Sequence, residues 1–450
     1  MSYQPINIEF YEKTRVFLIS ATKLLISALN KGEQIPSFTV KEHKVFREKP
    51  NCIAHTITDC AKQDYITFIY NHIKELESLP EYNKCLEVMR ADPTISKHLA
   101  QGIVGTWYTN YSSSMPWNYL EYFLLKQHVL HSEKSEFDDE AFDSMYFDLE
   151  KFFYSDFIEL KVFSPLHNFS SEIDDFDLGN GLRIRKININ ERDQLLNENE
   201  MFQNRRLLNY FHPPEYAMEL IFQTEKLLET PKICSPPPSS CINVIELFNN
   251  LVTALRLFKE STVLFSMLKI IPVLDVHNIE SVSSNFLASS NLLYRKSLGQ
   301  TYILRETEIN EFQHFWNKFD NLNQSTKFSM AIRRFNYGYE RDRSEDKLLD
   351  YMIAFEALFS KTDDNTSNIS HKLSIRVARL LKSEYEEKET IKRMKRFYGK
   401  RSGVVHGDEL ELDREVVNNV EKYLRESIML FGERLESEEH NDIISHLDLD

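Results

Sequence analysis

Hydrophobic residues recur at three- and four-residue spacings through the last third of the chain, and this spacing predicts one helix after another. The six expected helices cover 308–319, 324–339, 345–360, 369–383, 389–400 and 414–435. Within the third of them, one stripe contains Leu349, Met352, Ile353, Glu356 and Phe359. Six consecutive helices of this kind are typical of a helical bundle.

The first 300 residues mix helical and strand patterns. Helical spacing predicts helices over 10–29, 64–79 and 119–130, and a capped helix over 190–203. The residues Asp-Leu-Gly-Asn-Gly at 177–181 predict a tight turn, and the alternation after them predicts a hairpin strand from 182. The apolar segment 263–274 is either one buried strand or two short ones. The acidic run 133–150 is expected to be solvated surface.

A length of 450 residues exceeds what one hydrophobic core usually organises. We therefore expect an α+β N-terminal region, residues 1–300, of one or two subdomains, followed by an all-α helical-bundle C-terminal domain, residues 305–437. The Pro-rich segment 235–240 is a linker or a surface loop. The acidic tail 438–450 is expected to be solvated, with shielding of basic residues as the alternative.

The formal net charge of −15 argues against a protein that coats nucleic acid non-specifically, and it leaves room for a local basic patch. Five cysteines in a long chain fit reduced thiols better than a disulfide framework, so no disulfide between Cys234 and Cys241 is expected. The N-terminus lacks the apolar core of a signal peptide, and no run of 18 uncharged apolar residues follows. These features predict a cytoplasmic protein without a membrane segment.

One segment departs from this acidic balance. Residues 371–401 hold eleven lysines and arginines against four glutamates, a net charge of +7, which is where a polyanion is expected to bind. The candidate RNA-binding residues in it are Lys372, Arg376, Arg379, Lys392, Arg393, Lys395 and Arg396.

The basic segment ends in Arg401-Ser402-Gly403-Val404-Val405-His406-Gly407. Positions 401 and 406 point about 140° apart on an unbroken helix. The two glycines allow the backbone to bend or end there, so that both side chains can reach one phosphate. Histidine exchanges protons near neutral pH, and arginine's planar fork holds a phosphate while charge develops on it. The pattern therefore predicts metal-independent RNA cleavage by Arg401 and His406.

The flanking sequence resembles a known family. The helix at 345–359, with its Ala-Phe-Glu-Ala-Leu core, the helix at 369–381 and the closing Arg-Ser-Gly-Val-Val-His-Gly together resemble the ApeA-like branch of the HEPN superfamily, over about residues 305–437. The resemblance implies a helical domain that dimerises, brings two Arg-x4-His motifs into one cleft and acts as an endoribonuclease in anti-phage defence. It places Arg401 and His406 at the catalytic positions and implies that the N-terminal region senses infection.

Other residues near the motif have less certain roles. Many members of that superfamily have Asn, Asp or His after the arginine, whereas this chain has Ser402, which cannot carry charge. Glu356 is either a carboxylate of the site or a structural partner of Arg376 or Arg401. Tyr398 and Lys400 either contact RNA by stacking and charge or serve packing and surface.

Two groups of candidate metal ligands are also present. Cys52, His55 and Cys60 supply three ligands where a structural zinc site needs four. Asp346 and Asp350 are more typical of helix-surface charges than of metal ligands. No metal site and no cofactor are expected.

The sequence thus predicts an endoribonuclease that leaves 2′,3′-cyclic phosphate ends on structured RNA such as tRNA. The expected partners are this RNA, a phage-derived protein as trigger, and a second copy of the chain or a higher homo-oligomer. The alternative is a non-catalytic dimerisation module that binds RNA or nucleotide and recruits a partner. The N-terminal region contains no P-loop, G-x-G-x-x-G or G-x-S-x-G motif, so no second enzyme is predicted there.

Overall fold

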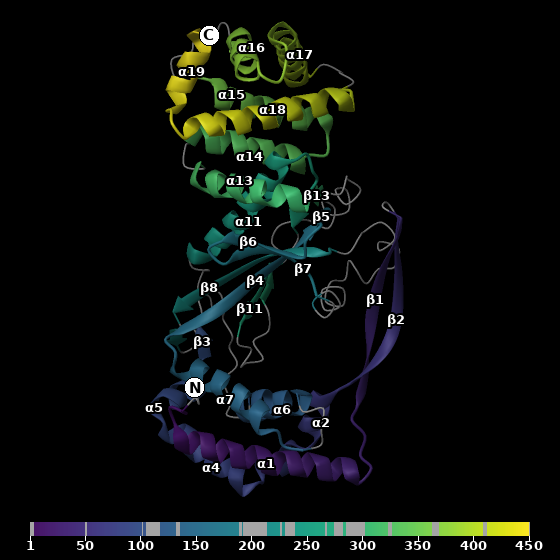
Figure 1. The fold of residues 1–450 in the computed structure, drawn as a ribbon, viewed down its shortest axis with the longest axis vertical. Coiled ribbons are helices and arrows are strands. Elements are labelled where there is room, and N and C mark those ends of the chain that lie inside the picture. Colours follow the sequence, from purple (N-terminus) through teal and green to yellow (C-terminus); the bar gives the residue numbers. More distant parts are fainter. Residues whose placement is uncertain are drawn as a thin grey trace.

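The chain forms three consecutive parts along one long axis in the computed structural model: N-terminal helices, a central sheet and a C-terminal helical bundle (Figure 1). The structure describes residues 4–49, 52–100, 102–104, 118–131, 136–188, 191, 214–225, 227–229, 239–265, 268–273, 282–284, 302–322, 326–361, 369–407 and 412–449. The expected mixed α+β fold with a helical bundle is therefore present.

The N-terminal part is a cluster of helices. They are α1 (Ile8–Asn30), α2 (Tyr65–Asn71), α3 (Ile73–Glu77), α4 (Pro80–Ala91), α5 (Pro93–Ala100), a π-helix (Asn118–Leu125), α6 (Lys126–His131) and α7 (Asp139–Tyr154). α1 matches the predicted helix and begins at Asn7, whose side chain accepts from the backbone N–H of Phe10. The prediction of one helix over 64–79 is wrong, because the helix is interrupted at His72, which separates α2 from α3.

The acidic run was expected to be solvated surface, and this prediction is wrong over α7. Asp139 and Glu140 at the start of α7 are exposed, whereas Phe142, Tyr146 and Leu149 are fully buried. Glu150 is also buried, and its carboxylate accepts from the backbone N–H of Asn7 at 2.9 Å. The apolar residues interleaved at helical spacing therefore decide where this segment packs.

A long two-stranded ribbon of β1 (Ser37–Lys49) and β2 (Cys52–Gln63) was not predicted. The two strands pair antiparallel from Ser37 opposite Gln63 up to Lys49 opposite Cys52. In Figure 1 the ribbon leaves the N-terminal helices and runs beside the central sheet.

The central sheet is antiparallel throughout, in the order β12-β11-β4-β8-β7-β6, and β10 pairs with β4 beside this path. Its strands are β4 (Phe157–His167), β6 (Asp175–Gly179), β7 (Leu182–Lys186), β8 (Tyr216–Glu225), β10 (Leu264–Phe265), β11 (Leu268–Pro272) and β12 (Val282–Ser284). The predicted turn at 177–181 is confirmed, with φ of +90°, +53° and +78° at Gly179, Asn180 and Gly181. The apolar segment 263–274 contains two short strands, β10 and β11.

Two small strand pairs join parts that are distant in sequence. β3 (Gly102–Val104) pairs antiparallel with β9 (Leu227–Glu229), and β5 (Phe169–Ser171) pairs parallel with β13 (Tyr302–Leu304). After β13, the short 3-10 helix Glu306–Glu308 leads into the C-terminal bundle.

The C-terminal bundle contains all six predicted helices. They are α13 (Ile309–Leu322), α14 (Thr326–Glu340), α15 (Ser344–Phe359), α16 (Ile369–Leu380), α17 (Glu387–His406) and α18 (Arg414–Leu435). A further helix, α11 (Ser239–Phe258), was not predicted; it contacts α13 and α18 and lies between the sheet and the bundle (Figure 1). The packing therefore continues across the expected boundary near residue 305.

The expectation of a solvated tail at 438–450 is wrong. Residues His440–Leu449 form α19, which contacts α16 and α18 and buries Ile443, Ile444 and Leu447. These three apolar residues recur at helical spacing among the acidic ones, and their burial outweighs the net charge of the segment.

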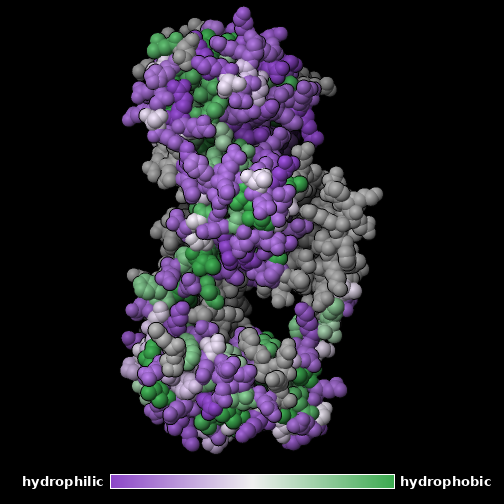
Figure 2. All heavy atoms as spheres, viewed as in Figure 1, coloured by the Kyte–Doolittle hydropathy of each residue, from purple (hydrophilic) through white to green (hydrophobic). Residues whose placement is uncertain are grey.

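Two sequence predictions fall on residues outside the described ranges: most of the helix expected over 190–203, and the Pro-rich segment before residue 239. No helix in the described part of the chain has both the length and the apolar character needed to cross a membrane. The face of the bundle seen in Figure 2 is mostly hydrophilic, with scattered hydrophobic residues.

Candidate functional site

Arg401 lies near the C-terminal end of α17, where it reaches α15. Its Nη2 is 3.6 Å from Oε1 of Glu356, and both side chains are about a quarter exposed. Its guanidinium also lies 5.6 Å from the ring centre of Tyr398, one turn earlier on α17. Glu356 therefore pairs with Arg401, one of the two partners predicted for it, and this contact links α17 to α15.

Tyr398 completes this small cluster. Burial raises the pKa of the Tyr398 hydroxyl, and the nearby Glu356 carboxylate, which accepts its hydrogen bond, raises it further. Arg401 has the opposite, lowering effect. Tyr398 therefore remains a neutral hydrogen-bond donor that helps to orient Glu356.

His406 is the last residue of α17 and is exposed to solvent. Gly407 follows in the left-handed conformation with φ of +80°, and its N–H bonds back to the carbonyls of Gly403 and Val404. Val405, beside the histidine, is 56% exposed. The second glycine of the motif therefore ends the helix directly after the histidine.

The expected bend at Gly403 is wrong, because α17 continues unbroken through it to His406. Gly403 is buried, so its missing side chain serves close packing. On a continuous helix, Arg401 and His406 project about 140° apart and are separated by about 7.5 Å along the axis. The two side chains therefore point away from each other on α17 of a single chain.

Two of the predicted RNA-binding residues have structural roles. Arg376 is 2% exposed; its Nε donates to Oδ1 of Asp448 at 2.7 Å and its Nη1 to the Phe359 carbonyl at 2.7 Å. Arg379 donates to the Leu447 carbonyl at 2.7 Å. The assignment of Arg376 to RNA binding is wrong, because its side chain is buried against α19. Arg379 also contacts α19 but is partly exposed, and its role in RNA binding stays a prediction.

The remaining cations of the basic segment lie at the surface. Lys392, Lys395 and Arg396 are exposed on α17, and Ser402 and Lys400 are half-buried nearer the motif. Arg393 pairs with Glu389 one turn earlier, at 3.1 Å. Lys372 on α16 is half-buried. A cationic surface along α17 leading to Arg401 thus persists without Arg376 and Arg379.

Within the described ranges, no group of three or more His, Cys, Asp or Glu residues is placed to hold a metal ion. The side chains of Cys52 and His55 lie outside the described residues, and Cys60 is half-buried on β2. Asp350 is buried and pairs with Arg334 and Arg341, each at 2.8 Å, so it holds α14 and the loop after it against α15.

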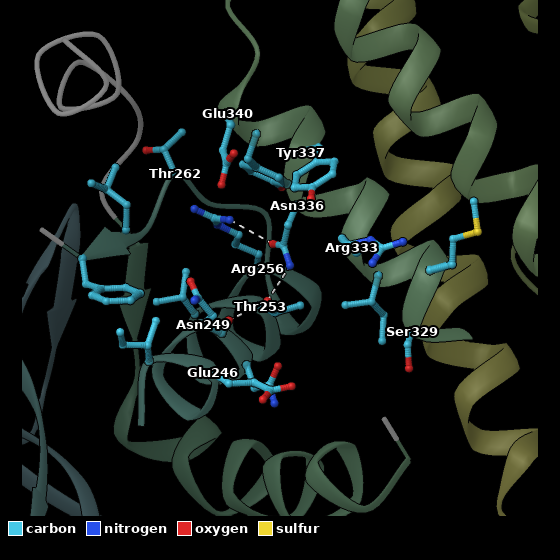
Figure 3. Close-up of a pocket in the computed structure, with 18 of the residues that line it drawn as sticks. Glu246, Asn249, Thr253, Arg256, Thr262, Ser329, Arg333, Asn336, Tyr337 and Glu340 are labelled. Carbon is cyan, nitrogen blue, oxygen red and sulfur yellow. Dashed lines mark hydrogen bonds between the residues drawn. The ribbon is translucent and has the colours of Figure 1, made fainter. Parts of the chain in front are cut away.

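A cavity that sequence analysis did not predict lies between α11 and α14. Its volume is about 730 Å³, within the usual range for small-molecule sites. In its middle, Arg256 Nη1 donates to Oδ1 of Asn336 at 2.9 Å, and Asn336 Nδ2 donates to Oγ1 of Thr253 at 2.6 Å (Figure 3). The one available signal was a single arginine in the apolar run at 251–258.

Comparison with known proteins returned no likeness: no protein-family model matches the chain, and no curated protein and no solved structure matches it. The functional assignment therefore depends on the residues themselves.

Proposed function

We propose that this protein is a metal-independent endoribonuclease of the HEPN type, in its ApeA-like branch, acting in anti-phage defence on structured RNA such as tRNA. The observation that supports the proposal most is the end of α17. There the partly exposed Arg401 lies near the end of the helix, and a solvent-exposed histidine is its last residue. The exposed cations of α17 supply a surface on which an RNA backbone can lie.

The proposed reaction is an in-line attack of a 2′-hydroxyl on the adjacent phosphate. The 2′-oxygen–phosphorus bond forms, the bond to the 5′-oxygen breaks, and a 2′,3′-cyclic phosphate results. One proton leaves the 2′-hydroxyl and one is added to the 5′-oxygen; His406 performs one of these transfers, and Arg401 stabilises the charge on the phosphate.

A homodimer fits the divergence of the two side chains. Since Arg401 and His406 project about 140° apart on one continuous helix, a site that uses both is more easily built from two copies of α17. We propose that the arginine of one copy acts with the histidine of the other, and that the N-terminal region, with a phage-derived protein as trigger, controls the site in the cytoplasm.

The test compares RNA cleavage by the wild-type chain, R401A and H406A in the presence of a metal chelator. Loss of one proton-transfer group is expected to slow cleavage by about 10²- to 10⁴-fold. The controls R90A and H314A remove an exposed arginine and an exposed histidine outside the basic segment and should cleave at the wild-type rate. Cleavage that required magnesium, or that survived in H406A, would contradict the proposal.

The composite site has its own test. An equimolar mixture of R401A and H406A contains mixed dimers in which one of the two sites retains both groups, so it should regain part of the wild-type activity. A mixture as inactive as its components would place both groups of a site on one chain.

A non-catalytic module that binds RNA or nucleotide as a dimer is the second candidate. The Arg401–Glu356 ion pair favours it, because this pairing partly neutralises the proposed catalytic cation. On this alternative, H406A would bind RNA and protect cells as the wild type does.

A further inference from the structure

The cavity between α11 and α14 has the chemistry of a site for a small organic anion. Its deepest cation is Arg256, which is half-buried. The Nε of Arg256 donates to the Val263 carbonyl at 3.0 Å and Nη1 donates to Asn336, so both known acceptors are neutral. The guanidinium also lies 4.7 Å from the ring centre of Tyr339.

No carboxylate lies within ion-pair distance of Arg256 among the residues the structure describes. Burial lowers the pKa of Arg256, whereas the more distant Glu340 and Glu421 act in the opposite direction. An arginine that is desolvated beside a cavity without a counter-ion is stabilised by any anion that enters. Arg256 therefore favours an anionic ligand.

The walls of the cavity suit the rest of such a ligand. Apolar contact is available from Ile245, Val252, Leu264, Phe265, Met330 and Ile332, and the polar side chains on the wall include Asn249, Thr262 and Ser329. A largely apolar lining with a few convergent polar groups is the usual form of a small-molecule site.

The mouth of the cavity limits the charge of its ligand. Arg333 at the rim is exposed and adds a second cation, while Glu246 and Glu340 are exposed acids on opposite sides of Arg256 (Figure 3). The two acids repel a polyanion such as RNA and leave room for a single anionic group at Arg256. This cavity is thus distinct from the cationic surface of α17.

We propose that the cavity binds a small organic molecule whose single carboxylate or phosphate group pairs with Arg256 and whose neutral body hydrogen-bonds to the asparagines, with Arg333 at the rim adding attraction for the anion. Nucleoside monophosphates and amino acids both have this chemistry. The proposal does not depend on ribonuclease activity. The cavity lies between α11 and α14, whereas the proposed ribonuclease residues are on α15 and α17.

The test measures thermal stabilisation and calorimetric binding of the full chain with the four 5′-nucleoside monophosphates, the amino acids, inorganic phosphate and acetate. A ligand that binds only the folded chain raises its unfolding temperature. Binding by nucleoside monophosphates alone, or by amino acids alone, would identify the class. No binding by any of them up to about 10 mM, where even a millimolar Kd is visible, would overturn the proposal.

The decisive variant is Asn336→Asp, which keeps the shape of the side chain and places a carboxylate against Arg256. Its built-in counter-ion should lower the affinity for the anion by on the order of tenfold or more. Asn317→Asp adds the same charge at an exposed position of α13 outside the cavity and should bind normally. Arg333→Gln, at the exposed rim, should fold and bind about threefold more weakly. Wild-type affinity in both Asn336→Asp and Arg333→Gln would also overturn the proposal.

Discussion

Glu121 is a buried carboxylic acid on the π-helix of the N-terminal part. It is fully buried, and neither of its oxygens has a hydrogen-bond partner in the region that the structure describes. Burial, with a smaller effect from Glu77, raises the pKa of Glu121 from 4.5 to about 10. The folded chain therefore holds this group neutral at pH 7, where the unfolded chain ionises it.

This difference predicts that E121Q stabilises the protein. Each pKa unit of difference is worth about 1.4 kcal/mol, and 2.5 units separate 4.5 from pH 7, so the substitution is expected to raise the free energy of unfolding at pH 7 by about 3.5 kcal/mol. Because the folded pKa is raised, the wild type loses stability as the pH rises above 4.5, and the gain in E121Q should vanish near that pH. Urea unfolding at several pH values measures it.

The exposed Glu87 on α4 provides the control, since E87Q should leave the free energy of unfolding at its wild-type value. An E121Q variant that was less stable than the wild type at every pH would show that Glu121 has a partner worth more than its burial costs.

Two histidines, the buried His167 and the half-buried His440, predict loss of stability in mild acid. Burial lowers the pKa of both His167 and His440 to about 4, and the ring of His440 packs 4.8 Å from that of Phe431. The unfolded chain takes up these protons below about pH 6.5, while the folded chain resists until about pH 4. Their contribution is therefore complete above pH 6.5 and is lost as the pH falls towards 4. The urea midpoint of unfolding should fall less steeply between pH 7 and pH 4.5 in H440Q than in the wild type. An unchanged slope would show that His440 does not contribute to the loss of stability in acid.

At the scale of single elements, α19 shows that a charged segment can belong to the core. Asp448 binds Arg376 at 2.7 Å and Lys361 at 2.9 Å, so it supplies the acid that the buried arginine requires. Removal of one partner of a buried pair leaves an uncompensated charge.

We expect D448A to lower the free energy of unfolding by about 2 kcal/mol, because Asp448 itself is partly exposed. Its control on the same helix is D442A, at an exposed position, which should change stability little. Chemical denaturation distinguishes the two, and equal stability in both variants would mean that α19 is held by its apolar residues alone.

The helix α15 illustrates how far the pattern along one element can be trusted. Its existence and limits follow from helical spacing, but of the predicted stripe only Met352 and Phe359 are buried, while Leu349, Ile353 and Glu356 are half-buried. The other fully buried residues lie off that stripe and are Leu348, Tyr351, Ala354, Phe355 and Leu358. α15 contacts α14, α16, α17 and α18, so it is covered on several sides and no single stripe describes it.

At the scale of the whole molecule, the sheet and the bundle are joined through α11. Phe258 of α11 packs against Phe312 and Phe315 of α13, with ring centres 5.4 and 6.0 Å apart. Lys259 pairs with Glu308 at 2.8 Å across the same junction. The bundle therefore depends on a helix that precedes residue 305.

A fragment of residues 305–450 is accordingly expected to unfold at a lower temperature than the whole chain, since it exposes the rings of α13 to water. A fragment that begins at Ser239 retains α11 and should regain part of the loss. Calorimetry measures both, and a 305–450 fragment as stable as the whole chain would show that the bundle is an independent domain.

The sequence by itself determined the local elements. The spacing of apolar residues was sufficient for α1 and for the six helices α13 to α18, and the glycine-rich turn was sufficient for the β6–β7 hairpin. It also predicted Arg401 and His406 as candidate catalytic residues from one short motif, and Glu356 as a candidate partner of Arg401. The local elements among these features depend on residues that are close in the sequence, and the spacing of apolar residues is therefore enough to predict them.

Only the tertiary structure decided which charged and polar residues meet. It assigned Arg376 to Asp448, kept α17 straight through Gly403, turned the acidic tail into α19, and placed Arg256 against Asn336 beside a cavity. The physical reason is that a charge is stabilised by whichever partner lies within a few ångströms. Packing between elements determines that partner. The partners here are 70 to 80 residues apart in the sequence, which is too far for a local pattern to predict the contact.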